Sequence, residues 1–287
     1  MSQTTEAIRE AYRPKRPGIF QTLIETVREV ASRRRLIVYL VRADLKKRGA
    51  DTVLGNLWWI LDPLLTMLVY VILIAVIFQT KVEAYPLFVF CAILPWKWFS
   101  SSIADAVTCI TTRERIIKQV NFPKVVLPMA VVVGGVTSFA FGLIPLMIML
   151  VFLYGNHLTA WILALPIIAL VQFVFTLGVT FLASALTVFY RDVGNVATHA
   201  LRIWFYMSPA LYGAEQIASL TARHPEIATI YNLNPFAALF ESYRDIIYYG
   251  HAPEWGGLGL VLLESLVLLV LAVLFFRRVE PAFAKVI

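Results

Sequence analysis

Long apolar runs, each about as long as a lipid bilayer is thick, constrain the fold of this chain more than any other feature. A helix needs about 20 apolar residues to cross roughly 30 Å of hydrocarbon, where every backbone polar group must be paired. Hydrophobic residues make up 60% of the chain and charged residues 15%, against about a quarter charged in soluble domains. We therefore expect an all-α polytopic membrane protein with six transmembrane helices, near residues 57–78, 86–109, 125–154, 161–189, 193–213 and 257–276.

The distribution of Lys and Arg predicts the orientation of these spans. If the N-terminus is cytoplasmic, most cations fall in inside segments, in the stretches 9–48, 113–124 and 277–285. The outside loops then hold only Lys81, Arg223 and Arg244. Because cytoplasmic loops are enriched in Lys and Arg, we expect both termini in the cytoplasm of a bacterial cell. The net charge of +7 is then explained by membrane topology and does not require a nucleic-acid partner.

The stretch TTRERIIKQVNFPK, residues 111–124, joins the second and third expected spans and therefore faces the cytoplasm. Its apolar and charged residues are spaced as in a short amphipathic helix that ends before Pro123. One interpretation is a solvated loop that is basic because of topology, and the other is a docking surface for a cytoplasmic partner. The residues of that surface would be Thr112, Arg113, Glu114, Arg115, Ile116, Ile117, Lys118 and Gln119.

The N-terminal region, residues 1–56, contains a second amphipathic helix. From Ile19 to Ala31 apolar residues recur at helical spacing, with polar residues on the other side. Such a helix is expected to lie flat in the membrane interface with its cations near anionic headgroups. A plain membrane anchor is the alternative to a role in gating or in admitting substrate. The residues concerned are Phe20, Leu23, Ile24, Val27, Arg28, Arg33, Arg34 and Arg35.

A polar and aromatic stripe lies within the first expected span. Its members, four residues apart and therefore on one helix face, are Trp58, Asp62, Thr66 and Tyr70. This face is not expected to contact lipid, because an ionisable group inside a membrane usually faces a cavity or a partner. The alternative for Asp62 is a cap near the cytoplasmic edge, where it precedes Pro63.

Further aromatic residues occur in the second and fifth expected spans. In LPWKWFSSS, Pro95 and Lys97 fall in mid-span and predict a break in the helix or a wet interior. In the fifth span, Arg202 can extend to the cytoplasmic surface and Pro209 is expected to kink the helix. Each of these rings could line a pathway, with ordinary packing as the alternative. These aromatic residues are Trp96, Trp98, Phe99, Trp204, Phe205, Tyr206 and Tyr212.

The outer loop between the fifth and sixth spans also contains helical signals. Asn234 is a typical N-cap and Pro235 a typical first residue of a helix, and an apolar face follows. We expect re-entrant or surface helices here that cover the outer mouth of a pathway.

Missing motifs argue against several classes of protein. The stretch GADTVLGN lacks the lysine of a phosphate-binding loop, so this chain is not expected to bind ATP or any other cofactor. The four His residues are scattered, which leaves no pattern for catalysis or a metal site. Cys91 and Cys109 fall about 27 Å apart on one expected helix and cannot form a disulfide. Paired carboxylates and inverted repeats, which an ion-coupled carrier would show, are not evident.

Several short motifs, in their order and spacing, resemble the membrane permeases of polysaccharide-exporting ABC transporters. These permeases export O-antigen, teichoic acid and related cell-surface glycans. The resemblance covers nearly the whole chain. The matching stretches are LVRADLKKRGADTVLGNLWWILDP (40–63), LPWKWFSSSI (94–103), RIIKQVNFPKVVLP (115–128), FYRDVGNV (189–196), SPALY (208–212) and NP (234–235).

The resemblance implies a permease subunit for a lipid-linked polysaccharide, working as two copies with two separate ATPase subunits that bind ATP and Mg²⁺. Residues 111–124 would contain the coupling helix, and the N-terminal helix would be the interface helix. Residues 57–287 would form the transmembrane domain. Because six spans are few for a polymer-wide conduit, the path is expected at a two-fold dimer interface. An ABC permease that exports a lipid or a drug is the alternative.

Overall fold

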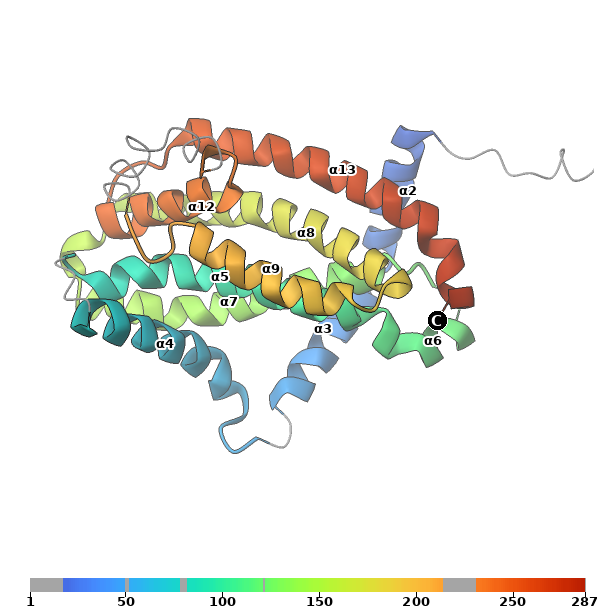
Figure 1. Ribbon diagram of the computed structural model, residues 1–287, viewed down its shortest axis with the longest axis horizontal. Helices are drawn as coiled ribbons and strands as arrows, with labels where there is room; N and C mark the ends of the chain where they lie inside the picture. Colours follow the sequence, from blue (N-terminus) through green and yellow to red (C-terminus); the bar gives the residue numbers. More distant parts are fainter. Residues whose placement is uncertain (1–17, 50–51, 78–81, 121, 214–230, 287) are drawn as a thin grey trace, which may run out of the picture.

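The computed structural model describes residues 18–49, 52–77, 82–120, 122–213 and 231–286, and among these residues it is helical with no strand. Long helices run side by side along one axis, and two N-terminal helices cross the bundle near one end (Figure 1). The all-helical prediction is thus confirmed for the part of the chain that the structure describes.

Within the described ranges, four helices are long and apolar enough to cross a membrane. They are α5 (Tyr85–Cys109), α7 (Val126–Phe152), α8 (Leu165–Phe189) and α13 (Trp255–Val286), and a 3₁₀ turn, η5 (Ala160–Ala164), precedes α8. Their starts lie within a few residues of the predicted ones. Two shorter elements lie beside them: the apolar α4 (Trp58–Val71), which continues as the π-helix η2 (Ile72–Ile77), and the more polar α9 (Val193–Met207). The predicted end of the first span, Phe78, lies outside the described residues.

The end of α9 differs from the prediction. The helix was expected to continue to Gly213 with a kink at Pro209, but it ends at Met207 and Ser208 is already extended. Proline lacks a backbone N–H and clashes with the preceding helical turn, so a helix that approaches it from the N-terminal side ends easily. Pro209 therefore follows the helix and does not kink it.

Helix α5 forms the centre of the bundle. Nearly all of its residues from Tyr85 to Phe99 are buried, and it packs against α4, α7, α8 and α9. The helix continues through Pro95, so the predicted break is wrong. Instead Gln172 of α8 donates a 2.8 Å hydrogen bond to the Pro95 carbonyl, and the Tyr243 hydroxyl donates at 2.9 Å to Gln172. These polar links in the core join three helices, because Tyr243 belongs to α12 (Pro235–Arg244).

Small residues let α7 approach α5 closely. Gly134, Ser138 and Gly142 are four residues apart and lie along one side of α7, a pattern that favours close helix packing. A Cβ on Gly142 would lie 2.6 Å from the end of the Leu94 side chain, so a larger residue here would have to displace that side chain. Nothing lies within 4 Å of such an atom on Gly134. The contact is made instead by the adjacent Gly135, where a Cβ would lie 2.6 Å from the Trp98 ring.

Helix α12 and the π-helix η6 (Asp245–Tyr249) lie at one end of the bundle (Figure 1). The Asn234 side chain accepts a 3.1 Å hydrogen bond from the Phe236 N–H, which confirms the predicted cap. The predicted apolar face is at most 1% exposed and consists of Phe236, Leu239, Phe240, Tyr243 and Ile247. It packs against α5, α8 and α13. The rest of the expected outer loop, 214–230, lies outside the described residues.

The opposite end carries α2 (Ile19–Ser32), α3 (Arg34–Gly49) and a short helical segment that consists of η3 (Thr111–Arg113) and α6 (Glu114–Gln119). The C-terminal end of α13 lies beside α6 (Figure 1). Helix α2 packs on α13, and α3 packs on α7.

Candidate functional site

The η3–α6 segment presents one accessible face at the end of the bundle. Ile117 is 5% exposed and packs in a core cluster with Val125 and Phe283, which fixes the orientation of the short helix. The opposite face is exposed and carries Thr112, Arg115, Ile116 and Gln119. Ile116 is 49% exposed among these polar residues, as in a small docking surface with an apolar centre.

The three other charged residues of this segment, Arg113, Glu114 and Lys118, are paired within the chain. Arg113 makes hydrogen bonds of 2.8 and 2.7 Å to the two carboxylate oxygens of Asp44 in α3, and a third to the Cys109 carbonyl. Its side chain is only 18% exposed. Lys118 pairs with Glu114 at 2.6 Å, and this pairing lowers the pKa of Glu114. The geometry therefore favours Arg115 over Arg113 for contact with a partner.

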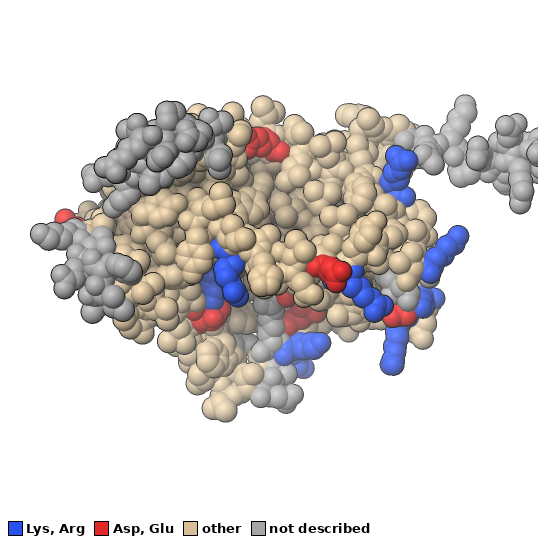
Figure 2. Space-filling model, in the orientation of Figure 1, with Lys and Arg blue, Asp and Glu red and all other residues tan. Residues whose placement is uncertain are grey.

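Helix α2 has two different faces. Leu23, Thr26 and Val30 turn toward the bundle, whereas Phe20, Ile24 and Val27 are exposed on the other side. The predicted apolar face is thus divided between the bundle and the surroundings. The cationic residues predicted here are exposed, namely Arg28, Arg33, Arg34 and Arg35. Figure 2 shows that most Lys and Arg side chains on the visible face gather toward this end of the bundle.

An ion pair lies between α4 and the middle of α5. Lys97 donates to the Asp62 carboxylate and also to the Thr66 hydroxyl at 3.2 Å. Asp62 is 63% exposed and Lys97 29% exposed, so the pair lies on the surface of the protomer. The alternative role of Asp62 as a helix cap is not observed. Its carboxylate instead accepts a hydrogen bond from Lys97 of the neighbouring helix.

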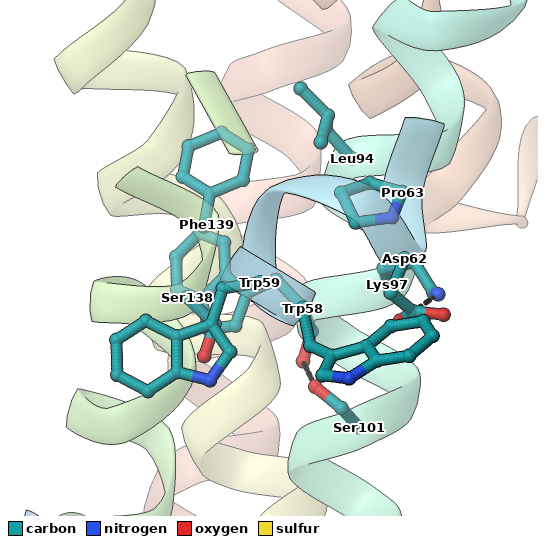
Figure 3. Close-up of a pocket in the computed structure, with 10 residues that line it drawn as sticks. Trp58, Trp59, Asp62, Pro63, Leu94, Lys97, Ser101, Ser138 and Phe139 are labelled. Atoms are coloured by element: carbon teal, nitrogen blue, oxygen red, sulfur yellow. Dashed lines mark hydrogen bonds and ion pairs between the residues drawn. The ribbon is translucent and has the colours of Figure 1, made fainter. Parts of the chain in front are cut away.

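A pocket of about 270 Å³ adjoins this ion pair. In Figure 3 Asp62, Lys97 and the Trp58 ring lie on one side of the pocket, and Ser138 and Phe139 lie on the other. Trp59 and Ser101 also line it. The pocket therefore offers aromatic faces, a carboxylate, an ammonium and hydroxyls together, which is a lining suited to a polyhydroxylated ligand.

Most of the other predicted pathway aromatics are packed inside the protomer. Trp96, Trp98, Phe99 and Phe205 are between 0 and 8% exposed. Trp96 contacts Phe236 edge-on with ring centroids 4.9 Å apart, and Trp204 donates a 2.9 Å hydrogen bond to Asn234. Tyr70 contacts Phe205 at 5.5 Å. Trp98 is the exception, because it packs against Phe139 of α7 and lines the pocket beside Asp62. The other rings hold α4, α5, α9 and α12 together, so in this conformation their faces are occupied by one another.

Three predicted pathway residues remain at least partly accessible near α9. Arg202 is exposed, Tyr206 is 56% exposed and Tyr212 is partly exposed. The structure does not bring them into the pocket beside Asp62. Their contact with a substrate stays a prediction.

Sequence reasoning missed the role of Arg244, which was counted as a cation of an outside loop. Its side chain is 2% exposed, lies 3.7 Å from the centre of the Phe88 ring and donates a 2.7 Å hydrogen bond to the Ala210 carbonyl. Weaker bonds reach the Phe88 and Tyr212 carbonyls. Burial lowers the pKa of Arg244 to about 10, which leaves it charged at neutral pH. The only signal in the sequence was a cation at the end of an otherwise apolar helix face.

Comparison with known proteins identifies the family. Residues 35–248, from α3 to η6, match the family described as ABC-2 type transporter. This chain belongs to the ABC-2 type transporter family.

Relatives of this ABC-2 type protein share nearly its whole length. It is 36% identical over 263 residues to the O-antigen export system permease protein RfbA of Myxococcus xanthus, an alignment that covers 92% of this chain and 99% of the relative. Two proteins of the same name from Klebsiella pneumoniae are 27% and 28% identical, over 88% of this chain and 95% of theirs. The resemblance seen in the sequence motifs is thus confirmed, and the chain is a membrane component of a transporter.

Proposed function

We propose that this chain is the permease subunit of an ATP-driven exporter that moves a lipid-linked cell-surface polysaccharide across the bacterial cytoplasmic membrane. The observation that carries the proposal is the alignment, end to end, with proteins named as O-antigen export permeases. An ABC permease that exports a lipid or a drug is the second candidate, since the same architecture could carry it.

In this proposal six helical elements span the membrane and both termini are cytoplasmic. The four long helices are completed by α4 with η2 and by α9. The 14 residues of α4 and the 6 of η2 give 20 residues, about 30 Å at 1.5 Å per residue, which is close to the hydrocarbon thickness. The gathering of cations at the end that carries α2 and α6 supports the orientation. Residues 1–56 then form the cytoplasmic region with its interface helix, and residues 57–287 form the permease domain.

Two copies of the chain pair with two cytoplasmic ABC ATPase subunits, which hold ATP and Mg²⁺. We assign η3 and α6 as the coupling helix. Its exposed face, with Ile116 at the centre and Arg115 and Gln119 beside it, would dock in a groove of the ATPase. The apolar face of α2, flanked by Arg28 and the run from Arg33 to Arg35, would lie on the membrane surface.

The polymer would pass along the face that carries the Asp62–Lys97 pair. Asp62 lies near the start of α4, but its carboxylate is exposed beside Lys97 at the middle of α5, and an exposed charge at that depth costs a few kcal/mol in lipid. This face is therefore expected to line an aqueous path between two copies. Sugar hydroxyls could bond to Asp62, Lys97 and Thr66, and a ring could rest on Trp58. Arg202 and Tyr206 would lie along the same path.

A complementation experiment tests the proposal. Deletion of the chain from its host should remove one glycan from the cell surface and make the lipid-linked glycan accumulate inside, and the intact gene should reverse both effects. Unchanged surface glycan would contradict the proposal. The second candidate would be favoured if a hydrophobic drug or a simple lipid, and not the lipid-linked glycan, stimulated ATP hydrolysis by the purified complex.

A further inference from the structure

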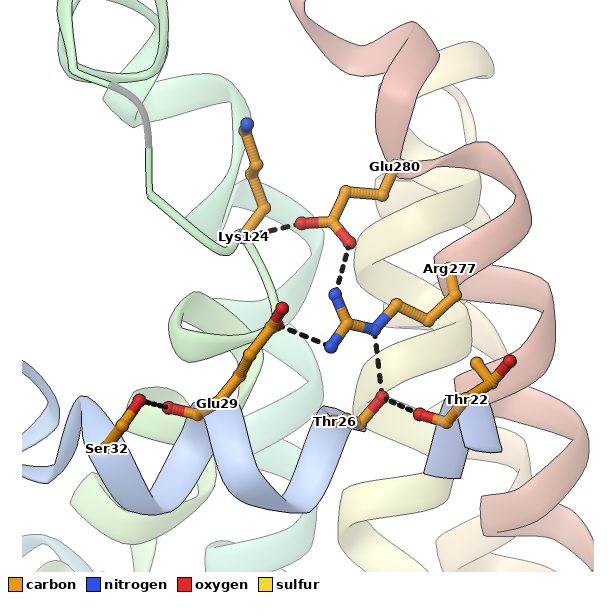
Figure 4. Close-up of polar contacts among 7 residues, drawn as sticks. All are labelled: Thr22, Thr26, Glu29, Ser32, Lys124, Arg277 and Glu280. Atoms are coloured by element: carbon orange, nitrogen blue, oxygen red, sulfur yellow. Dashed lines mark hydrogen bonds and ion pairs between the residues drawn. The ribbon is translucent and has the colours of Figure 1, made fainter. Parts of the chain in front are cut away.

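A cluster of polar contacts joins three elements at the cytoplasmic end of the protein (Figure 4). Arg277 of α13 uses all three guanidinium nitrogens: Nε donates to the Thr26 hydroxyl at 2.9 Å, Nη2 to the Glu29 carboxylate at 2.5 Å, and Nη1 to Glu280 at 3.1 Å. Thr26 and Glu29 belong to α2, so a single side chain fastens the interface helix to the C-terminal helix.

Glu280 extends the cluster toward the coupling helix. Its second carboxylate oxygen accepts a 2.7 Å hydrogen bond from the backbone N–H of Lys124, a few residues beyond the end of α6. The Glu280 side chain is 12% exposed and that of Arg277 is 17% exposed. Charge-assisted hydrogen bonds in such partly buried positions are stronger than ion pairs in open solvent, which are worth little.

A second tie is formed at the other end of the coupling helix. The bidentate pair between Arg113 and Asp44 connects η3 to α3. Helices α2 and α3 follow one another directly, with Arg33 between them. The coupling helix is therefore fastened on both sides to the same N-terminal pair of helices, and α3 leads along the chain to Trp58 at the start of α4.

We propose that Arg277, Glu280 and Glu29 form a polar strut that makes the interface helix and the coupling helix move as one body. Through this strut, a displacement of the coupling helix by the ATPase is passed to α2 and α3, and from there to the start of α4 beside the Asp62–Lys97 pair. Arg277 is a positioning residue in this scheme, since it contacts neither nucleotide nor cargo. The inference rests on the proposed function for its ATPase.

A distance measurement tests the mechanical part on the full chain alone, in lipid nanodiscs. Spin labels would be attached to Arg28→Cys on α2 and Gln119→Cys on α6, both exposed positions, while the native Cys91 and Cys109 are buried and stay unlabelled. We expect a narrow distance distribution in the otherwise unchanged chain and a clearly broader one with Arg277→Gln. Equal widths would overturn the inference. The matched control is Arg278→Gln, which removes the same charge from the exposed neighbour.

A transport measurement tests the functional part on the complex with its ATPase. Arg277→Gln and Glu29→Gln should each lower the amount of polysaccharide moved per ATP hydrolysed by about threefold or more, the range expected when a contact that couples two sites is lost. Because the contact that Glu29→Gln weakens is already lost in Arg277→Gln, the double variant should be no worse than Arg277→Gln alone. Arg278→Gln should leave this ratio unchanged.

The other outcomes are also informative. If ATP hydrolysis and transport fall in parallel in both variants, Arg277 only supports the fold and the inference is wrong. If Arg277→Gln does not accumulate in the membrane, the transport ratio of Glu29→Gln tests the inference instead. This variant is expected to fold, because Glu29 is 38% exposed and glutamine keeps the shape of its side chain. Failure of the proposed function would look different: no ATPase would bind the chain, while the spin-label result would still stand.

Discussion

At the scale of single residues, Arg244 shows how much one buried cation can organise. It holds the turns that follow α9 against α5, through the Ala210 carbonyl and the Phe88 ring. Arg244→Ala would leave the Ala210 carbonyl without this donor and would create a cavity beside the Phe88 ring. We therefore expect a loss of about 2–4 kcal/mol in unfolding free energy. Thermal unfolding in detergent measures this. Arg202→Ala, which removes an exposed arginine, should leave Tm nearly unchanged, and equal effects of the two variants would contradict this role of Arg244.

Asp245 gives a prediction for pH. Burial raises the pKa of Asp245 to about 6, although His251, 3.6 Å away, opposes the shift, and Glu241 and Glu254 are nearby. Because the pKa in the folded state is above the usual value near 4, the folded protein binds the proton more tightly than the unfolded chain does. The contribution of Asp245 to stability is therefore greatest below about pH 4 and is lost as the pH rises from about 4 to 6.

Asp245→Asn tests this at the two ends of the range. At pH 7 the variant should melt roughly 2–4 °C higher than the unchanged chain, the shift that about 1 kcal/mol causes in a protein of this size. At pH 4.5 the difference should shrink or vanish. A variant that is less stable than the unchanged chain at pH 7 would show that the ionised carboxylate is needed by the fold.

At the scale of helices, the coupling helix carries one exposed arginine, Arg115, and one arginine that is paired within the chain, Arg113. Replacing each by alanine gives a matched pair of variants. Arg115→Ala removes an exposed side chain and should weaken binding of the ATPase by about tenfold, the effect of a moderate interface contact, without a change in Tm. Arg113→Ala breaks the pair with Asp44 and should lower Tm. Binding by pull-down and thermal unfolding separate the two effects. Identical results from the two variants would contradict the proposed division.

The ion pair between α4 and α5 predicts a rescue. Lys97→Met leaves the Asp62 carboxylate, which is 63% exposed, without its partner on the face where two copies are expected to meet, and should lower Tm modestly. Adding Asp62→Asn removes the unpaired charge and should restore the Tm measured in detergent. Export should stay low in the double variant if these groups contact the polymer. Normal export would show that the pair serves packing alone.

The helices were predictable where local signals decide them. Helix α5 was predicted over 86–109 and spans Tyr85–Cys109, because a long apolar run in a membrane protein can only be helical. The end of α9 was predicted wrongly, since a proline such as Pro209 can either kink or end a helix, and the turns after Met207 are held by Arg244, which is distant in the sequence. For the same reason, the sequence identified the stripe of Trp58 and Asp62 but not the lysine that pairs with it.

At the scale of the whole molecule, we propose that one copy of the chain forms only part of the conduit. The Asp62–Lys97 pair and Tyr206 are exposed on a protein that the comparisons place in a transporter family. Among the described residues the charged docking features lie at one end and α12 at the other, as a permease driven from the cytoplasmic side requires (Figure 1). A second copy is expected to complete the path, because a two-fold pairing repeats the same surface.

The most direct test of this account is transport in sealed vesicles that contain the purified chain together with its ATPase partner. We expect a lipid-linked polysaccharide to become protected inside inverted vesicles only when the chain, the ATPase and hydrolysable ATP are all present. Protection that appears without the ATPase, or ATP hydrolysis by the purified chain alone, would contradict the claim that a separate subunit drives this permease.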